Sequence, residues 1–192
     1  MDQKTWDSLT KYKLWGSFDG EYPAASRTFY APYDGVHDVI MTVVKSAKQS
    51  LSVAMFGFDD TEVNDAILAA AENPDIRVKV ALDSSQAAGK GETPLLAKWP
   101  ATDYLNSLVI GQSSKHAISH DKIIVADDCM ITGSTNLSTS GETLQNNQCT
   151  VEWNSRKAVE GLNVIDRIFA EMVANPKVEG YRHYVGGATN AS

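Results

Sequence analysis

The spacing of apolar and polar residues switches between helical and strand periods from Arg27 onward. Apolar residues recur at three- and four-residue intervals in three segments, which predicts helices over 36–48, 61–71 and 158–173. Short apolar or alternating runs predict strands over 27–30, 51–58, 77–83, 108–110, 122–126, 130–132 and 148–153. Strands that alternate with helices predict an α/β fold with a mixed, largely parallel sheet that is flanked by helices on both faces.

The two ends of the chain differ from this alternating region. We interpret residues 1–26 as an N-terminal arm, 27–176 as a single domain and 177–192 as a C-terminal tail. The last dozen residues are rich in Gly, Ala, Ser and Asn, which predicts a mobile segment.

The N-terminal arm contains a short stretch with helical spacing. Its large apolar residues fall along one side of a predicted helix, namely Trp6, Leu9, Tyr12 and Trp15. We expect the arm to pack on the domain or on a partner subunit. The alternative is an arm that contacts a substrate, because exposed aromatic rings can stack on bases.

Charge and hydropathy limit the classes of partner. A net charge of −7 argues against a broad nucleic-acid-binding surface, although it leaves room for a small basic site. The sequence contains no run of about 18 uncharged apolar residues, and its N-terminus lacks a basic segment followed by an apolar one. We therefore expect a cytoplasmic protein without stable membrane association.

Cysteine and histidine usage predicts neither a disulfide nor a metal centre. Cys129 and Cys149 each lie in an apolar run, where a small buried free thiol fits. The four histidines and two cysteines are not clustered at the close spacing that zinc sites show. His37 and His183 suggest no role from sequence alone.

One segment contains a chemically informative combination of residues. His120 and Lys122 are two positions apart in a predicted strand, so an imidazole and an ammonium are expected on the same face. Such a pair suits a phosphate, since one group attacks while the other balances charge. Gly133 and Ser134 bring backbone N–H groups to the end of the next strand, and Asn136 adds an amide donor. Each fragment alone is more often structural, and only the combination is specific.

This combination resembles the signature of the phospholipase D superfamily, most closely that of its small single-motif bacterial endonucleases. The signature is His-x-Lys-x4-Asp followed by Gly-Ser-x-Asn, and it is occupied here by His120, Lys122, Asp127, Gly133, Ser134 and Asn136. The resemblance extends from about residue 27 to 175 and implies an α-β-α sandwich in which 27–176 form the catalytic domain.

The resemblance also implies a mechanism. His120 would attack phosphorus and form a covalent phosphohistidine, while a second His120 from another subunit protonates the leaving oxygen. Lys122 and Asn136 would hold the non-bridging oxygens. Because this chain carries one motif, a homodimer with a two-fold axis through the site follows. Neither a metal nor another cofactor is implied.

Two departures from the family pattern affect this expectation. The interval between Asp127 and Gly133 is one residue shorter, which predicts a tighter turn. The family places a Glu about eleven residues after the Asn, and the matching residue here is Asn147, next to Gln148. We expect an amide to orient His120 in place of the carboxylate. The alternatives are Glu142 reaching in from the loop, or reduced activity.

Other residues are assigned to the rim of the site or to its support. Lys115 and His116 are candidates for a flanking phosphate contact, and Ser134 and Ser138 for further substrate contacts; for His116 and Ser138 the alternative is a plain exposed or loop residue. Asp127 is expected to be structural rather than catalytic.

The leading functional hypothesis is a metal-independent nuclease that acts on DNA, with RNA as an alternative substrate. Phe56 and Phe58 lie where relatives have aromatic residues near the site, with a core role as the safer interpretation. A second hypothesis is a phospholipase or phosphatidyl transferase, against which the acidic charge counts. A third is a catalytically silent module that binds nucleic acid.

Overall fold

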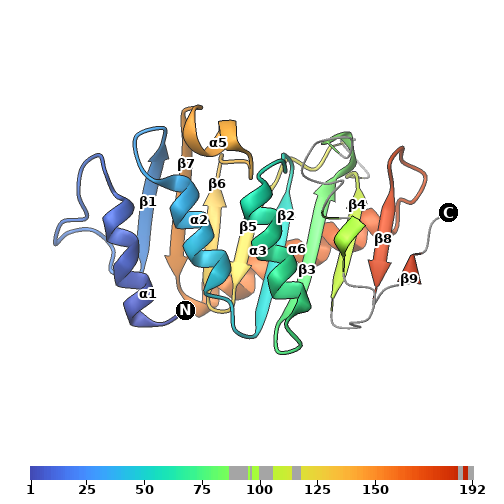
Figure 1. Cartoon of the computed structure of the whole chain (residues 1–192), viewed down its shortest axis with the longest axis horizontal. Coiled ribbons are helices and arrows are strands. Elements are labelled where there is room, and N and C mark those ends of the chain that lie inside the picture. The colour runs from blue at the N-terminus through green and yellow to red at the C-terminus, as the bar shows by residue number, and fades with distance from the viewer. Residues whose placement is uncertain (87–94, 96, 100–105, 114–117, 186–187, 190–192) are drawn as a thin grey trace.

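A computed structural model shows one mixed β-sheet with helices on both faces (Figure 1). The structure describes residues 1–86, 95, 97–99, 106–113, 118–185 and 188–189. Within these residues the sheet has nine strands in the order β1-β7-β6-β5-β2-β3-β4-β8-β9. Their bounds are β1 Ser26–Ala31, β2 Ser50–Met55, β3 Arg77–Asp83, β4 Ser107–Gly111, β5 Lys122–Ala126, β6 Cys129–Gly133, β7 Asn147–Trp153, β8 Arg182–Val185 and β9 Ala188–Thr189.

The predicted α/β class with a mixed sheet is confirmed, but the sheet is not largely parallel. Among the described strands, β2–β3 and β3–β4 are the parallel pairs, and the other neighbours run antiparallel. The reason is the short connection between β5 and β6: Ala126 pairs with Cys129 across a two-residue turn. Such a turn allows only an antiparallel hairpin, whereas a parallel pair needs a long crossover. It also confirms the predicted tight turn.

The helices divide between the two faces of the sheet (Figure 1). α1, α2 and α3 lie on the face turned to the viewer, α6 lies behind the sheet, and the short α5 lies at its upper edge. Their bounds are α1 Gln3–Ser8, α2 Val36–Lys45, α3 Thr61–Glu72, α5 Thr139–Thr143 and α6 Ser155–Val173, with 3-10 turns at Leu9–Tyr12 and Ser84–Gln86.

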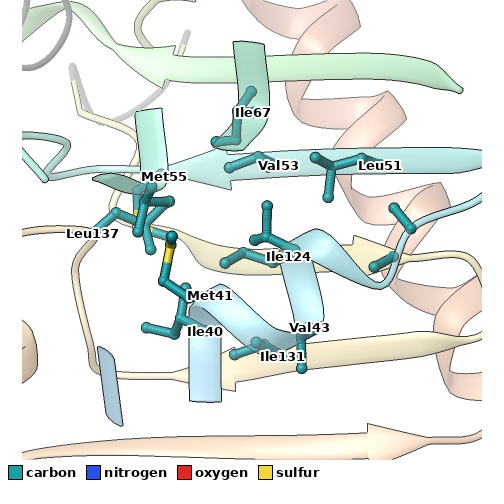
Figure 2. Close-up of a cluster of buried hydrophobic side chains, with 14 of the residues drawn as sticks. Ile40, Met41, Val43, Leu51, Val53, Met55, Ile67, Ile124, Ile131 and Leu137 are labelled. Carbon is teal, nitrogen blue, oxygen red and sulfur yellow. The ribbon is translucent and has the colours of Figure 1, made fainter. Parts of the chain in front are cut away.

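Apolar residues from α2 and the central strands form the larger core (Figure 2). Ile40 and Val43 of α2 pack among Val53, Ile124 and Ile131, and all five are nearly or fully inaccessible to solvent. The opposite faces of the strands pack against α6 in a second cluster, as the strict in–out alternation of strand side chains requires. The buried sheet is therefore a rigid base for side chains at its edge.

Asparagine and aspartate side chains decide where two helices begin. α3 is capped by Asp60 rather than by the predicted Thr61, because the Asp60 carboxylate accepts hydrogen bonds from the Glu62 and Val63 N–H groups. α6 begins at Ser155, earlier than predicted, because Asn154 caps it.

The N-terminal arm packs on its own domain, one of the two expected arrangements. Trp6 and Leu9 are buried, and the Trp6 ring lies 5.7 Å from that of Trp153. The composition predicts that the last dozen residues are mobile, but residues 182–185 form a strand. This segment forms β8 and pairs with β4, since the edge of β4 offers unpaired backbone groups that a further strand satisfies.

The predicted free cysteines are confirmed, and both are buried. Burial raises the pKa of the Cys129 thiol to about 12 and also raises that of Cys149. Among the described residues, the structure contains no helix of the length and apolarity that a membrane crossing needs.

Candidate active site

The site residues gather at the edge of the sheet where α5 lies (Figure 1). The carboxyl ends of β2 and β6 meet the amino ends of β5 and β7 there, as the pairs Met55–Lys122 and Gly133–Cys149 show. Segments that are far apart in the sequence therefore present their terminal residues to one region.

His120 and Lys122 lie next to each other, though not by strand alternation alone. β5 begins at Lys122, so His120 precedes the strand and its side chain is exposed. The buried Lys122 donates from Nζ to the His120 carbonyl oxygen at 2.9 Å. The Phe56 ring links the two, 4.7 Å from the His120 ring and 5.1 Å from Lys122 Nζ.

The environment of Lys122 changes its acidity. Burial lowers the pKa of the ammonium, and the charges of Asp121 and Asp83 oppose this effect. The side chain is thus a desolvated cation beneath an exposed imidazole, and a charge in such a setting interacts more strongly with an incoming phosphate than it would in water.

Two backbone contacts hold the segment that carries His120. Ser119 N–H donates to the fully buried Asp83 carboxylate, and Phe56 N–H donates to the Asp121 carbonyl at 3.0 Å. Asp83, whose role the sequence leaves open, therefore anchors the residue that precedes His120. Asp83 is the last residue of the strand predicted over 77–83, and this position at a strand end is the sequence signal that could have identified its anchoring role.

Asn136 is positioned by Gly57, a residue that the sequence analysis missed. Gly57 N–H donates to Asn136 Oδ1 at 3.1 Å, which leaves the Nδ2 amide hydrogens for another acceptor. A Cβ atom on residue 57 would lie 2.9 Å from Asn136 Cγ, so only glycine permits this approach. No sequence pattern links the two residues, because 79 positions separate them.

Gly133 and Ser134 are tied to β7 instead of forming an open phosphate cradle. Ser134 N–H donates to the Gln148 carbonyl at 3.0 Å, and Ser134 Oγ donates to Asn147 Oδ1 at 2.9 Å. Gly133 has φ of +153°, and a Cβ there would lie 2.1 Å from the Gln148 carbonyl oxygen. The expected backbone cradle at Ser134 is therefore wrong, since sheet pairing uses that N–H.

Three residues are candidates for orienting His120, namely Asn147, Gln148 and Glu142. Within the described part of one chain, none of them forms a hydrogen bond with His120. The Asn147 amide donates to the Gly141 carbonyl at 2.9 Å, and Gln148 Nε2 donates to Thr150 Oγ1 at 3.0 Å. Glu142 is buried and pairs with His37 instead, because α5 buries Gly141 and Glu142 and packs against α2, which carries His37. Its predicted approach to His120 is thus corrected.

The remaining predicted residues have structural contacts or are not described. Ser138 is buried, and its hydroxyl caps α5 by accepting from Gly141 N–H at 3.0 Å, which replaces the expected substrate contact. Lys115 and His116 lie outside the described residues.

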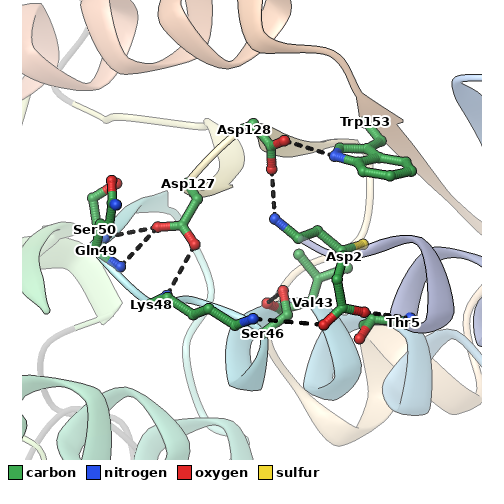
Figure 3. A network of polar contacts seen from close by, with 11 residues as sticks. Asp2, Thr5, Val43, Ser46, Lys48, Gln49, Ser50, Asp127, Asp128 and Trp153 are labelled. Atoms are coloured by element: carbon green, nitrogen blue, oxygen red, sulfur yellow. Dashed lines mark hydrogen bonds and ion pairs between the residues drawn. The ribbon is translucent and has the colours of Figure 1, made fainter.

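Asp127 has the contacts of a structural residue (Figure 3). Its carboxylate accepts hydrogen bonds from the N–H groups of Lys48, Gln49 and Ser50 at 2.9, 3.0 and 2.9 Å. It lies in the β5–β6 turn, at the opposite end of β5 from Lys122. Asp127 therefore links this turn to the start of β2.

A pocket opens beside His120 on the side of α6. Its described lining includes His120 and Asp121 together with Ile168 and Met172 of α6. The described lining of this pocket does not include Lys122 or Asn136, so it provides space beside the exposed imidazole of His120 but does not itself join the three polar groups.

The fold and this motif arrangement define a protein of the phospholipase D superfamily. The family model described as "Cardiolipin synthase, PLD-like domain" matches residues 40–172, and the chain belongs to this family. A comparison with curated proteins finds no match.

Solved structures with the same fold support this assignment. The phospholipase D family member Nuc from Salmonella typhimurium has a TM-score of 0.66 at 20% identity, over 84% of this chain and 98% of that one. NucT from Helicobacter pylori has a TM-score of 0.64 at 16% identity, over 77% and 96%. Phosphatidylserine synthase from Haemophilus influenzae has a TM-score of 0.64 at 15% identity, over 99% of this chain but 44% of that one.

Proposed function

We propose that this protein is a metal-independent nuclease that cuts DNA through a covalent phosphohistidine at His120. The observation that carries the proposal is that three polar residues contact the neighbouring residues Phe56 and Gly57. Phe56 contacts His120 and Lys122, and the Gly57 N–H donates to Asn136. This gathers a nucleophile, a buried cation and an amide donor in one place, which are the groups that a phosphodiester displacement needs.

The proposed reaction proceeds in two displacements. A neutral imidazole nitrogen of His120 forms a bond to phosphorus while the bond from phosphorus to the leaving oxygen breaks. The protonated His120 of a second subunit gives its proton to that oxygen. Water then attacks phosphorus and gives a proton to the second His120, and the nitrogen–phosphorus bond breaks. Lys122 and Asn136 balance charge on the non-bridging oxygens in both steps.

Because each chain carries one such motif, the general acid in this mechanism is the His120 of a second subunit. His120 is exposed in one chain, which is compatible with a two-fold axis that brings two imidazoles together. We expect light scattering to give twice the 20.9 kDa chain mass. A monomer that cleaves phosphodiesters at full rate would contradict the shared site.

A nuclease is preferred over a lipid enzyme because of the extent of the structural alignments. Alignment spans nearly the full length of Nuc and NucT but less than half of the phosphatidylserine synthase, so the chain corresponds in extent to the first two. The net charge of −7 does not separate the two candidates, because nucleic acid and anionic lipid surfaces are both negatively charged. The family description and the synthase nevertheless make phosphatidyl transfer the second candidate.

The decisive experiment compares wild type, His120→Ala and His183→Gln on supercoiled plasmid and on short single strands in excess EDTA. We expect wild type and His183→Gln to cleave, and His120→Ala to lose at least about 10³-fold in rate. Equal cleavage by His120→Ala would contradict the assignment of the nucleophile. Phospholipid hydrolysis without nucleic-acid cleavage would select the lipid enzyme, and binding of nucleic acid without either reaction would select the silent module.

A further inference from the structure

Three acid–base side chains that the proposed chemistry does not use lie close together, next to the segment that follows Asn136. His37 lies in the first turn of α2, Asp60 caps α3, and Glu142 lies in the first turn of α5. His37 Nδ1 is 2.7 Å from Glu142 Oε2 and 3.1 Å from Asp60 Oδ2. One nitrogen and two carboxylate oxygens thus lie within 4.8 Å of one another.

Each carboxylate in this cluster has an oxygen without a backbone donor. Asp60 Oδ1 accepts the two N–H groups that begin α3, which leaves Oδ2 beside His37. Glu142 is 1% exposed; its Oε2 contacts His37, and its Oε1 is buried without a hydrogen-bond partner. A buried carboxylate oxygen without a partner is unfavourable, and a cation that reaches it removes that penalty.

The charges around the cluster also favour a cation. Glu62 lies 3.6 Å from His37 Nε2, so three carboxylates surround one imidazole. Among the described residues, the ion pairs of Asp60 and Glu142 are both made with His37.

We propose that His37, Asp60 and Glu142 bind one divalent transition-metal ion of the zinc type. An imidazole nitrogen with two carboxylate oxygens is a ligand set that zinc accepts, and water supplies the fourth position. Ligand atoms about 2.0 Å from a tetrahedral ion lie about 3.3 Å apart, so the observed 2.7 and 3.1 Å separations need only small outward movements.

The position of the ion sets its role. The Asp60 N–H donates to the Leu137 carbonyl, and Ser138 caps the helix that carries Glu142. The ion would therefore join α2, α3 and α5 next to the two residues that follow Asn136. The His37 side chain is 25% exposed, which gives an entry route. The ion would stabilise this loop and would lie outside the phosphodiester chemistry at His120.

The test titrates ZnCl2 into the chelator-treated full chain by calorimetry and follows the melting temperature. We expect one saturable zinc per chain and a rise of about 5 °C in Tm at a hundredfold excess over Kd. MgCl2 is expected to have no effect, because imidazole favours zinc over magnesium.

Variants separate this site from other zinc ligands. Glu142→Gln keeps the size of the side chain and should bind zinc at least tenfold more weakly, as should His37→Gln. His183→Gln, which changes a histidine outside the cluster, should bind like wild type. Absence of saturable zinc binding to wild type, or undiminished binding by Glu142→Gln and His37→Gln, would overturn the proposal. Since the readout is binding without substrate, it does not depend on whether the nuclease proposal holds.

Discussion

Two histidines at the same edge of the sheet have opposite surroundings. His120 is exposed, with its ring against Phe56 and its carbonyl bonded to Lys122. His37 is half-buried, and its ring nitrogens face the carboxylates of Asp60, Glu62 and Glu142. The His120 imidazole is accessible from solvent, whereas the His37 imidazole is held by contacts with neighbouring carboxylates.

The two histidines therefore differ both in their access to solvent and in the charges that surround them. Three carboxylates raise the pKa of His37 in spite of its burial, so this imidazole tends to hold a proton or a cation. Asn147 occupies the position of the family carboxylate and makes its contacts with Ser134 and Gly141. The carboxylates therefore lie beside His37 and not beside His120, the histidine that we propose as the nucleophile.

Apart from His120→Ala, the largest effect on catalysis is expected from Lys122→Met. Loss of the buried ammonium should lower the single-turnover cleavage rate by about 10²–10³-fold, because a charge that stabilises the phosphoryl oxygens is removed. The free energy of unfolding should not fall, since methionine fits a buried site without desolvating a charge. A rate within tenfold of wild type would exclude Lys122 from the charge-balancing role.

The pH dependence of the same residue gives a second readout. Burial lowers the pKa of Lys122, against the opposing charges of Asp121 and Asp83, and the side chain is cationic only below that pKa. The alkaline fall in cleavage rate should therefore begin below the ordinary lysine range. Lys122→Arg should move this limb to higher pH, because guanidinium keeps its charge; a limb that stays in place would assign it to another group.

A smaller effect is expected from Gly133→Ala, which tests the backbone of the His120 region. The new Cβ would lie 2.1 Å from the Gln148 carbonyl oxygen, at a φ of +153° that favours glycine. We expect the free energy of unfolding to fall by about 3 kcal/mol in urea titrations. Gly20→Ala, where no atom lies within 4 Å, is the control and should change it by less than about 0.5 kcal/mol.

Asp60→Ala tests the region of His37. It removes the cap that the Glu62 and Val63 N–H groups use, so we expect a loss of about 1–2 kcal/mol in the free energy of unfolding of the metal-free protein. The cleavage rate should stay within about twofold. Asp60→Asn, which keeps the accepting oxygen, should retain most of the stability; an equal loss in both variants would show that charge, not capping, is responsible.

The smallest effect is expected from Asn147→Glu, which restores the family carboxylate. A nearby carboxylate favours the protonated imidazole, so the acidic limb of the pH–rate profile should move upward by up to about one unit. Gln148→Glu, whose side chain points to Thr150, is the matched control. An unchanged profile in both variants would remove Asn147 from the site.

Local patterns predicted much of the framework. β3 and β5 have the predicted bounds, because a short run of apolar, largely β-branched residues that ends at an aspartate is visible in a short window. His120, Lys122 and Asn136 were found through a motif whose parts are close in sequence. By contrast, β8 was not predicted, because its strand conformation depends on pairing with β4. In addition, the Gly and Ala residues that follow it in the sequence are typical of loops.

The α/β class, the central strands, the buried thiols and the superfamily motif could all be predicted from local sequence patterns. Three contacts became visible only in the folded chain: Gly57 hydrogen-bonds to Asn136, Asp83 accepts a hydrogen bond from the residue before His120, and Glu142 pairs with His37. These contacts join residues 36 to 105 positions apart. Their geometry depends on how strands are ordered in the sheet, and strand order is set by packing of the whole core, which no local pattern encodes.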